Sequence, residues 1–251
     1  MFSRQLLRNY SKSLLSATTA AQRRFISLQT IQTPNENALK FVSRDFKFLP
    51  EDLTNAVQIE DLPEATAKSP LATQLFKLNG VLSLMIGPDF VTVNKVDTSL
   101  SNNPELEWNH LANKVINVIC DSIDNKKLPV LNESYKQELY ESLDEPQDTD
   151  DDVTYEIKEL ISTRIRPALQ DDGGDIHFRS FDEETGTVYI KLQGACKSCS
   201  LSEDTLKNGI ESMLKHYVEE VEEVKAILDP EEEIAIAEFE KLEKRLKSKQ
   251  L

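Results

Sequence analysis

The sequence predicts an α+β protein made of two small α/β domains joined by an acidic linker, the second being a three-stranded sheet with two helices. Short alternating apolar runs, typical of strands, recur among helical patterns from residue 29 to residue 229. A chain of 251 residues is long enough for two cores of this size. Residues 141–152 contain seven acids and no base, which divides the patterned sequence in two.

Residues 1–28 have the composition of a mitochondrial transit peptide. The segment has no acid, since the first carboxylate of the chain is Glu36, and its basic residues are Arg4, Arg8, Lys12, Arg23 and Arg24. The alternative is a disordered basic tail. We therefore expect a protein of the mitochondrial matrix. We expect no membrane insertion, because no apolar run approaches about 18 residues, and no nucleic-acid partner, because the net charge is −15.

Residues 29–131 are expected to form the first domain. Residues 39–42 are typical of a strand, and Ser69 with Pro70 begins a short helix to Leu78. Runs 81–86 and 90–96 predict a hairpin around Gly87-Pro88-Asp89, and residues 106–123 have helical spacing. Cys120 on this helix is interpreted as a core residue and His110 as a surface or core-edge residue. This half has no nucleophile with a base and no phosphate loop, so we expect a binding module and not an enzyme.

Residues 132–152 are expected to be an acidic linker, because a run of like charges repels itself and stays extended. A docking tail for a basic partner is the alternative. Residues 230–251 are expected to be a charged helical tail, either packed lightly on its own domain or docked on a partner.

Residues 153–229 are expected to form the second domain. Its first helix has an apolar stripe and ends at the paired glycines of segment 171–175, which supply positive φ. Two strands follow, around a turn at residues 184–186, and then a helix containing His216 and a strand within 221–228. The stripe consists of Val153, Ile157, Leu160, Ile161, Ile165 and Ala168. Segment 172–175 is interpreted mainly as a helix stop and turn, rather than as the mouth of a metal or cluster site. His177 is expected to point away from the core, and His216 is interpreted as a surface residue.

Cys196 and Cys199 form a C-x-x-C motif between the second strand and the following helix. Backbone N–H groups at a helix start stabilise thiolates, and Lys197 acts in the same direction. The motif is therefore expected to present two deprotonated, accessible sulfurs. Disulfide exchange, half of a zinc site, half of an iron–sulfur site and a purely structural role all remain open.

Two cysteines supply half of the four ligands that zinc or a cubane cluster usually takes. A twofold homodimer completes the set most simply, because each motif then faces its copy. A cluster held between subunits is easy to release, which favours carriage over permanent electron transfer.

The second domain resembles the C-terminal domain of NifU in three segments, 166–175, 192–199 and 205–211. The first resembles the Nfu N-terminal domain at Ser69-Pro70-Leu71-Ala72, Leu75-Phe76 and Gly87-Pro88-Asp89-Phe90. The chain thus resembles mitochondrial Nfu-type iron–sulfur scaffold proteins. The resemblance implies a [4Fe-4S] cluster shared between two subunits, with Cys196 and Cys199 as ligands. It also implies upstream donors, namely the primary scaffold and A-type carriers, and apo-protein recipients such as lipoate synthase, aconitase and respiratory-chain subunits. Ser200 departs from the proline often found there in the family.

Two other classes remain as alternatives. One is a thioredoxin-like dithiol oxidoreductase, which normally needs a parallel β-α-β framework around the motif, whereas a hairpin precedes it here. The other is an interaction module with structural zinc.

Overall fold

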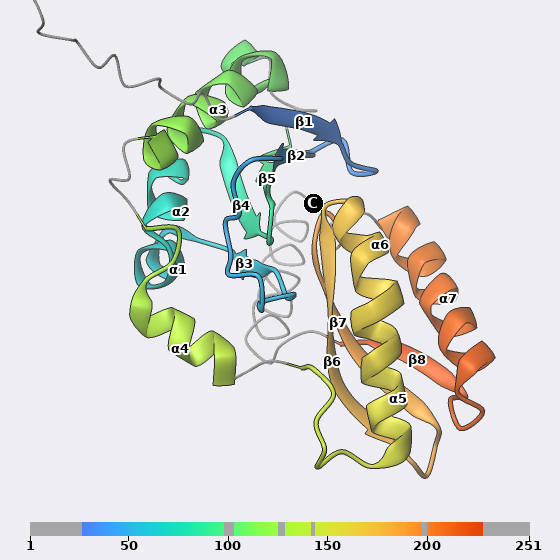
Figure 1. The fold of residues 1–251 in the computed structure, drawn as a ribbon. Coiled ribbons are helices and arrows are strands. Elements are labelled where there is room, and N and C mark those ends of the chain that lie inside the picture. The colour runs from blue at the N-terminus through green and yellow to red at the C-terminus, as the bar shows by residue number, and fades with distance from the viewer. Residues whose placement is uncertain (1–26, 98–102, 125–128, 142–143, 197–199, 228–251) are drawn as a thin grey trace, which may run out of the picture.

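The computed structural model describes residues 27–97, 103–124, 129–141, 144–196 and 200–227. It contains two sheets with separate cores, one in each half of the chain, and helices cover each of them (Figure 1). The predicted α+β class is therefore confirmed, including the three-stranded sheet of the second half. Among the described residues, no helix is long and apolar enough to cross a membrane.

The first half folds as a five-stranded antiparallel sheet in the order β1-β2-β5-β4-β3. Its strands are β1 (Leu28–Gln32), β2 (Ala38–Ser43), β3 (Val57–Ile59), β4 (Val81–Ile86) and β5 (Phe90–Lys95). Its helices are α1 (Leu62–Lys68), α2 (Pro70–Leu75), α3 (Trp108–Asp124) and α4 (Glu133–Glu141), with a 3-10 turn at Pro104–Leu106. The predicted hairpin and helix starting at Pro70 are confirmed, and Ser69 caps α2 by accepting a hydrogen bond from the Ala72 N–H at 3.0 Å. Helix α4 lies inside the segment expected to be linker.

The two faces of this sheet have different neighbours because strand residues alternate in direction. On β5, Val91 and Val93 belong to the apolar core beneath the helices. The opposite face carries a row of side chains at paired positions on four neighbouring strands: Lys40 pairs with Thr92, Thr92 with Met85, and Met85 with Gln58. We call Lys40, Thr92, Met85 and Gln58 the capping row. All four side chains are buried, so this face, which carries none of the described helices of the first half, is covered as well.

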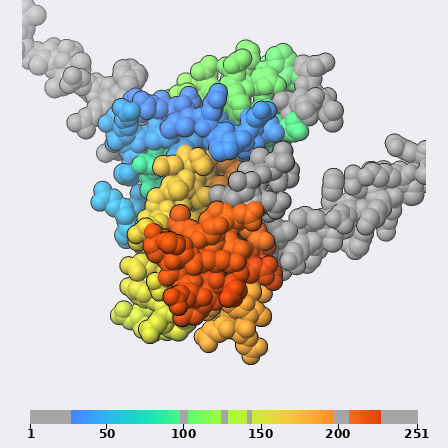
Figure 2. All heavy atoms as spheres, turned by 90° about the vertical axis from the view of Figure 1, so that its right-hand side faces the viewer, coloured from blue at the N-terminus to red at the C-terminus, as the bar shows by residue number. Residues whose placement is uncertain are grey.

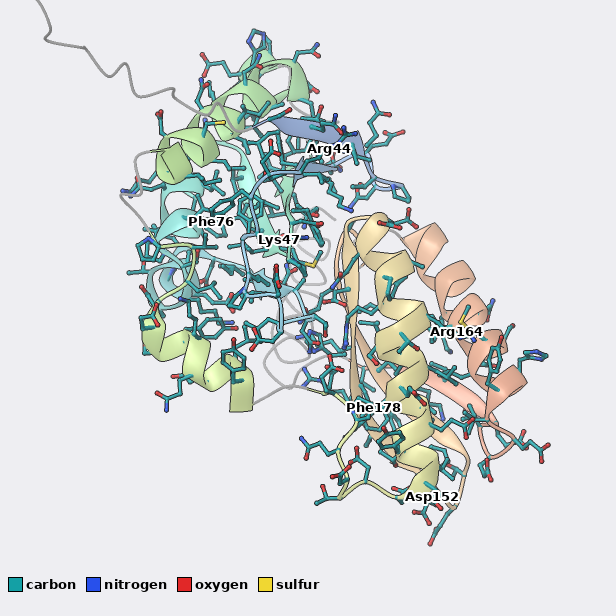
Figure 3. All side chains as sticks on the ribbon, in the orientation of Figure 1. Arg44, Lys47, Phe76, Asp152, Arg164 and Phe178 are labelled. Atoms are coloured by element: carbon teal, nitrogen blue, oxygen red, sulfur yellow. The ribbon has the colours of Figure 1, made fainter. Side chains whose placement is uncertain are left out.

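The second half begins with one continuous helix, formed by α5 (Asp152–Leu160), a π turn (Ile161–Ile165) and α6 (Arg166–Asp171). A hairpin of β6 (Gly174–Asp182) and β7 (Thr187–Gly194) follows, then α7 (Ser200–Tyr217) and β8 (Glu223–Ala226). Strand β8 pairs with β7 in parallel, which gives the order β6-β7-β8. Arg164 joins the helix to α7, where its Nη1 donates to the Tyr217 hydroxyl at 2.9 Å (Figure 3).

The prediction that Ala168 is a core residue is wrong, and the π turn is the reason. The Arg166 N–H donates to the Ile161 carbonyl, five residues back, and Pro167 has no N–H with which to restore the α pattern. The extra residue changes which of the later helix residues face the core, by one position along the sequence. Ala168, expected on the apolar stripe, is exposed, whereas Arg166 and Leu169 are buried.

The two halves pack directly on each other. In the view of Figure 2, blue atoms of the first half lie immediately above yellow atoms of the second. The capping row contacts the end of the second half where α6 meets β6 and where β7 ends: the Gln58 Oε1 accepts from the Gly194 N–H at 3.1 Å, and the Lys40 Nζ donates to the Gln170 carbonyl at 2.7 Å. The first half therefore covers one specific end of the second sheet.

Candidate metal centre

Cys196 lies just beyond the end of β7, at the end of the sheet covered by the first half. Gly194 has φ of +67°, a conformation that favours glycine, and it redirects the chain out of the strand. The Ala195 N–H then donates to the Gly173 carbonyl at 3.2 Å, which holds the turn against the start of β6. Cys199 lies outside the described residues, so the geometry below concerns Cys196.

Gly174 lies directly against the Cys196 side chain. A Cβ added to Gly174 would lie 2.1 Å from the Cys196 Sγ and 3.0 Å from its Cβ. Asp172 and Gly173, with φ of +80°, end the helix as predicted. The same segment therefore does two things: it stops the helix, and it leaves the space that the sulfur occupies. Only the first of these roles was the favoured prediction from the sequence.

The prediction of a deprotonated, accessible sulfur is wrong for Cys196 in this conformation. The side chain is 7% exposed and packs within the apolar core of its own half. Burial, together with the nearby carboxylates of Asp172 and Asp175, raises the pKa of the Cys196 thiol to about 12. In this conformation Cys196 is thus a buried thiol that holds its proton.

A buried polar network lies beside this site. Arg166 is 1% exposed, and its guanidinium donates to Asp144 at 2.8 Å and to Asp175 at 3.3 Å. Asp175 also accepts from the Ala56 N–H of the first half at 2.6 Å. Asp144 accepts from the Phe178 N–H at 2.8 Å and from the Asn55 side-chain amide. The network therefore connects the first half, the acidic segment before α5 and the strand that carries Gly174.

The carboxyls of this network respond differently to the same arginine. Burial alone would raise the pKa of Asp144, but Arg166, His177 and two hydrogen bonds outweigh it and hold that pKa below its usual value. Asp175 is completely buried, and this burial raises its pKa in spite of Arg166. Sequence reasoning missed the network. The available signal was an arginine next to the apolar stripe and a run of acids without any base.

The other candidate residues are one cysteine and three histidines, which lie on α3, β6 and α7. His110 and His216 are exposed, as predicted for surface residues. His177 is absent from the apolar core and lies 3.6 Å from Asp144 through its Nδ1. Cys120 is half-buried on α3 and is not one of the residues of the first core. Within the part of the chain that is described, no group of three or more His, Cys, Asp or Glu side chains is placed to hold a metal ion.

Comparison with known proteins assigns both halves. Residues 157–225 match the family described as NifU-like domain, and residues 28–126 match the family described as scaffold protein Nfu/NifU N terminal. The "NifU-like protein, mitochondrial" of Saccharomyces cerevisiae is 45% identical over 237 residues, covering 90% of this chain and 90% of that protein. "NifU-like protein C1709.19c" of Schizosaccharomyces pombe is 46% identical and covers 89% of this chain and 81% of that protein.

A human relative extends the similarity to animals. "NFU1 iron-sulfur cluster scaffold homolog, mitochondrial" of Homo sapiens is 41% identical over 210 residues, covering 83% of this chain and 74% of that protein. The names of the yeast and human relatives agree with the mitochondrial localisation predicted from residues 1–28. The chain belongs to the mitochondrial Nfu family of NifU-like proteins.

Proposed function

We propose that this protein is an iron–sulfur scaffold that carries a [4Fe-4S] cluster as cargo between two subunits and delivers it to apo-proteins of the mitochondrial matrix. Cys196 and Cys199 of each subunit would supply the four thiolates. The proposal places the carrier after the primary scaffold and A-type carriers, and before recipients such as lipoate synthase, aconitase and respiratory-chain subunits. It assigns no catalytic residue.

The observation that supports it most is the fit between Cys196 and Gly174 at the end of β7. A strand end followed by a space that only a glycine leaves open for one sulfur gives that sulfur a defined position. The names of the relatives, which include an iron–sulfur cluster scaffold homolog, support the chemical class.

Anaerobic reconstitution of the chain lacking residues 1–28 tests this proposal. We expect about four iron and four sulfide per dimer, with a brown chromophore. Cys196→Ser and Cys199→Ser should each abolish binding, while Cys120→Ala should retain it. Sedimentation should show that loading raises the dimer fraction.

The alternatives give different outcomes in the same experiment. Colourless protein with stoichiometric zinc would indicate the structural-zinc module, and dithiol turnover would indicate the oxidoreductase. A cluster-loaded monomer would contradict bridging between subunits.

A further inference from the structure

The capping row contacts the two chain segments that position Cys196. Lys40 donates through its Nζ to the Gln170 carbonyl at 2.7 Å and the Asp171 carbonyl at 3.3 Å, at the end of α6. Gln58 accepts from the Gly194 N–H at 3.1 Å, two residues before Cys196. These bonds join the first half to backbone groups on both sides of the thiol.

The two middle members of the row fill the space between these bonds. A Cβ on Gly194 would lie 2.7 Å from the Met85 Sδ, and a Cβ on Gly173 would lie 3.1 Å from the Thr92 Oγ1. Side chains of the first half thus lie directly against backbone that has no side chain of its own. Nothing the size of a second protein can approach Gly173 and Gly194 while the row is in place.

A second set of contacts holds the row in this position. The loop before β3 donates the Ala56 N–H to Asp175, and the Thr54 carbonyl accepts from the Gln170 side chain at 2.7 Å. Arg166 pairs with Asp144 in the segment that leads into α5. The docked arrangement therefore depends on a few hydrogen bonds and ion pairs around the short contact of the row.

The contact between the two domains has features that favour its opening. The Thr92 hydroxyl is fully buried and has no hydrogen-bond partner among the described residues, which disfavours the docked state because a buried hydroxyl loses its water. Polar groups dominate the named contacts, as in interfaces between domains that move relative to each other.

We infer that the face of the first domain that carries the capping row is an intramolecular cap, which covers the cysteine-bearing end of the second domain and must leave before a second copy can dock there. This inference rests on the proposed function for its second copy. A twofold contact that brings Cys196 next to its symmetry mate needs the same end of β7 that the capping row occupies. The cap and the second subunit thus compete for one surface.

Hydrogen exchange of the metal-free chain tests the cap without any cluster. The Ala56 and Gly194 amides donate only across the two domains, so docking should protect them. The double variant Lys40→Met/Gln58→Ala removes the capping bonds and keeps the apolar stem of Lys40. We expect exchange at the Ala56 amide, whose acceptor Asp175 is unchanged, to rise about tenfold, the change in an equilibrium constant expected for losing one or two hydrogen bonds. Gly194 loses its own acceptor in this variant, so its amide does not report docking there.

Alkylation of Cys196, followed by peptide mass spectrometry, gives a second readout in the same samples. The thiol should react faster in the double variant, and also in Gln170→Ala, which weakens the contact from the other domain. The control Lys114→Met/Gln74→Ala makes the same two changes on α3 and α2, on the helix side of the sheet, where Lys114 pairs with Glu105 and Gln74 accepts from Lys77.

The outcomes separate the cap from the scaffold function. Faster exchange and alkylation in both interface variants, with the control unchanged and all chains folded by circular dichroism, support the cap even if no cluster binds. Equal rates in wild type and both interface variants would overturn the cap and leave the scaffold proposal standing.

Discussion

Gly174 is the residue whose replacement tests the site most directly without removing a sulfur. Gly174→Ala places a methyl group where the Cys196 Sγ lies, since the two would be 2.1 Å apart. We expect the thiol to be displaced and the second domain to lose ~2 kcal/mol of unfolding free energy, as in other overpacked cores. Reconstituted iron per chain should fall although both cysteines are present.

Gly209→Ala is the matched control for this prediction. Gly209 lies on α7, and a Cβ there meets no atom within 4 Å. Alanine at this position should raise the free energy of unfolding by ~0.5–1 kcal/mol, because it lowers the entropy of the unfolded chain. Equal iron content in the two alanine variants would show that Gly174 does not shape the site.

Asp144 makes the stability of the protein depend on acidic pH. Its side chain is 9% exposed and pairs with Arg166, and its pKa in the folded chain lies below the usual 3.8. A carboxyl with a lowered folded pKa stabilises the fold at pH values above its unfolded pKa, and this contribution disappears as the pH falls through the folded value. Asp144→Asn should therefore cost ~2 kcal/mol at pH 7, because Arg166 keeps Asp175 as a partner.

Urea unfolding at a series of pH values measures this effect. The difference between wild type and Asp144→Asn should be constant from pH 7 to pH 5 and should shrink below about pH 3.8, where the wild-type carboxyl also becomes neutral. The control is Asp148→Asn, which removes the same charge from an exposed position of the same segment. A difference that stays constant down to pH 2 would contradict the ionic role of Asp144.

Among the elements, the helix of the second half contains one residue more than a regular α-helix would need, and the π turn accommodates it. The spacing of the apolar residues on either side of the π turn already includes this extra residue. Each helical residue turns about 100°, so Ala168, eleven residues after Ile157, returns to within about 20° of it. This spacing is why Ala168 was expected inside. The π turn delays the phase by one residue, so that Leu169 takes the inner position and Arg166 reaches Asp175.

Deletion of Ser162 should therefore be tolerated. It removes one residue from the π turn, leaves a regular α-helix and keeps Ile157 and Leu169 on one face, so we expect a change below ~1 kcal/mol. Insertion of an alanine after Ser162 should rotate α5 by about 100° against α6 and cost ~4 kcal/mol, through lost burial of Ile157 and Leu160. Urea unfolding compares the two, and a deletion as damaging as the insertion would contradict the phase argument.

Local patterns predicted the elements that depend on nearby residues. The hairpin of β4 and β5, the Ser69 cap and the position of the cysteine motif after β7 all follow from residues less than about 15 positions apart. Strand β1 was missed because it is an edge strand with a mostly exposed face, and β3 because it has only three residues. The burial of Cys196 could not be predicted, because its covering residues come from distant parts of the chain.

In the whole molecule, one surface, the end of the second sheet, serves both the contact between the two domains and the inferred contact with a second copy. The end of the second sheet carries Cys196, and the first domain contacts the backbone on both sides of it, at Gly194 and at Gln170. The polar network around Arg166 connects these contacts with the segment between the domains. A chain arranged in this way covers its thiol and needs a change of domain position before a second copy can reach the same surface.

This coupling predicts the kinetics of loading. If only a minor open population can load the cluster, the observed loading rate is the rate of the open state multiplied by the open fraction. Weakening the cap should increase this fraction and therefore the loading rate. Lys40→Met/Gln58→Ala should load iron and sulfide about tenfold faster than wild type, in proportion to the opening equilibrium. The final iron per dimer should be unchanged, because neither residue supplies a ligand. The rate is followed by absorbance during anaerobic reconstitution, beside Lys114→Met/Gln74→Ala as the control. Equal loading rates in all three chains would mean that opening of the cap does not limit access to Cys196.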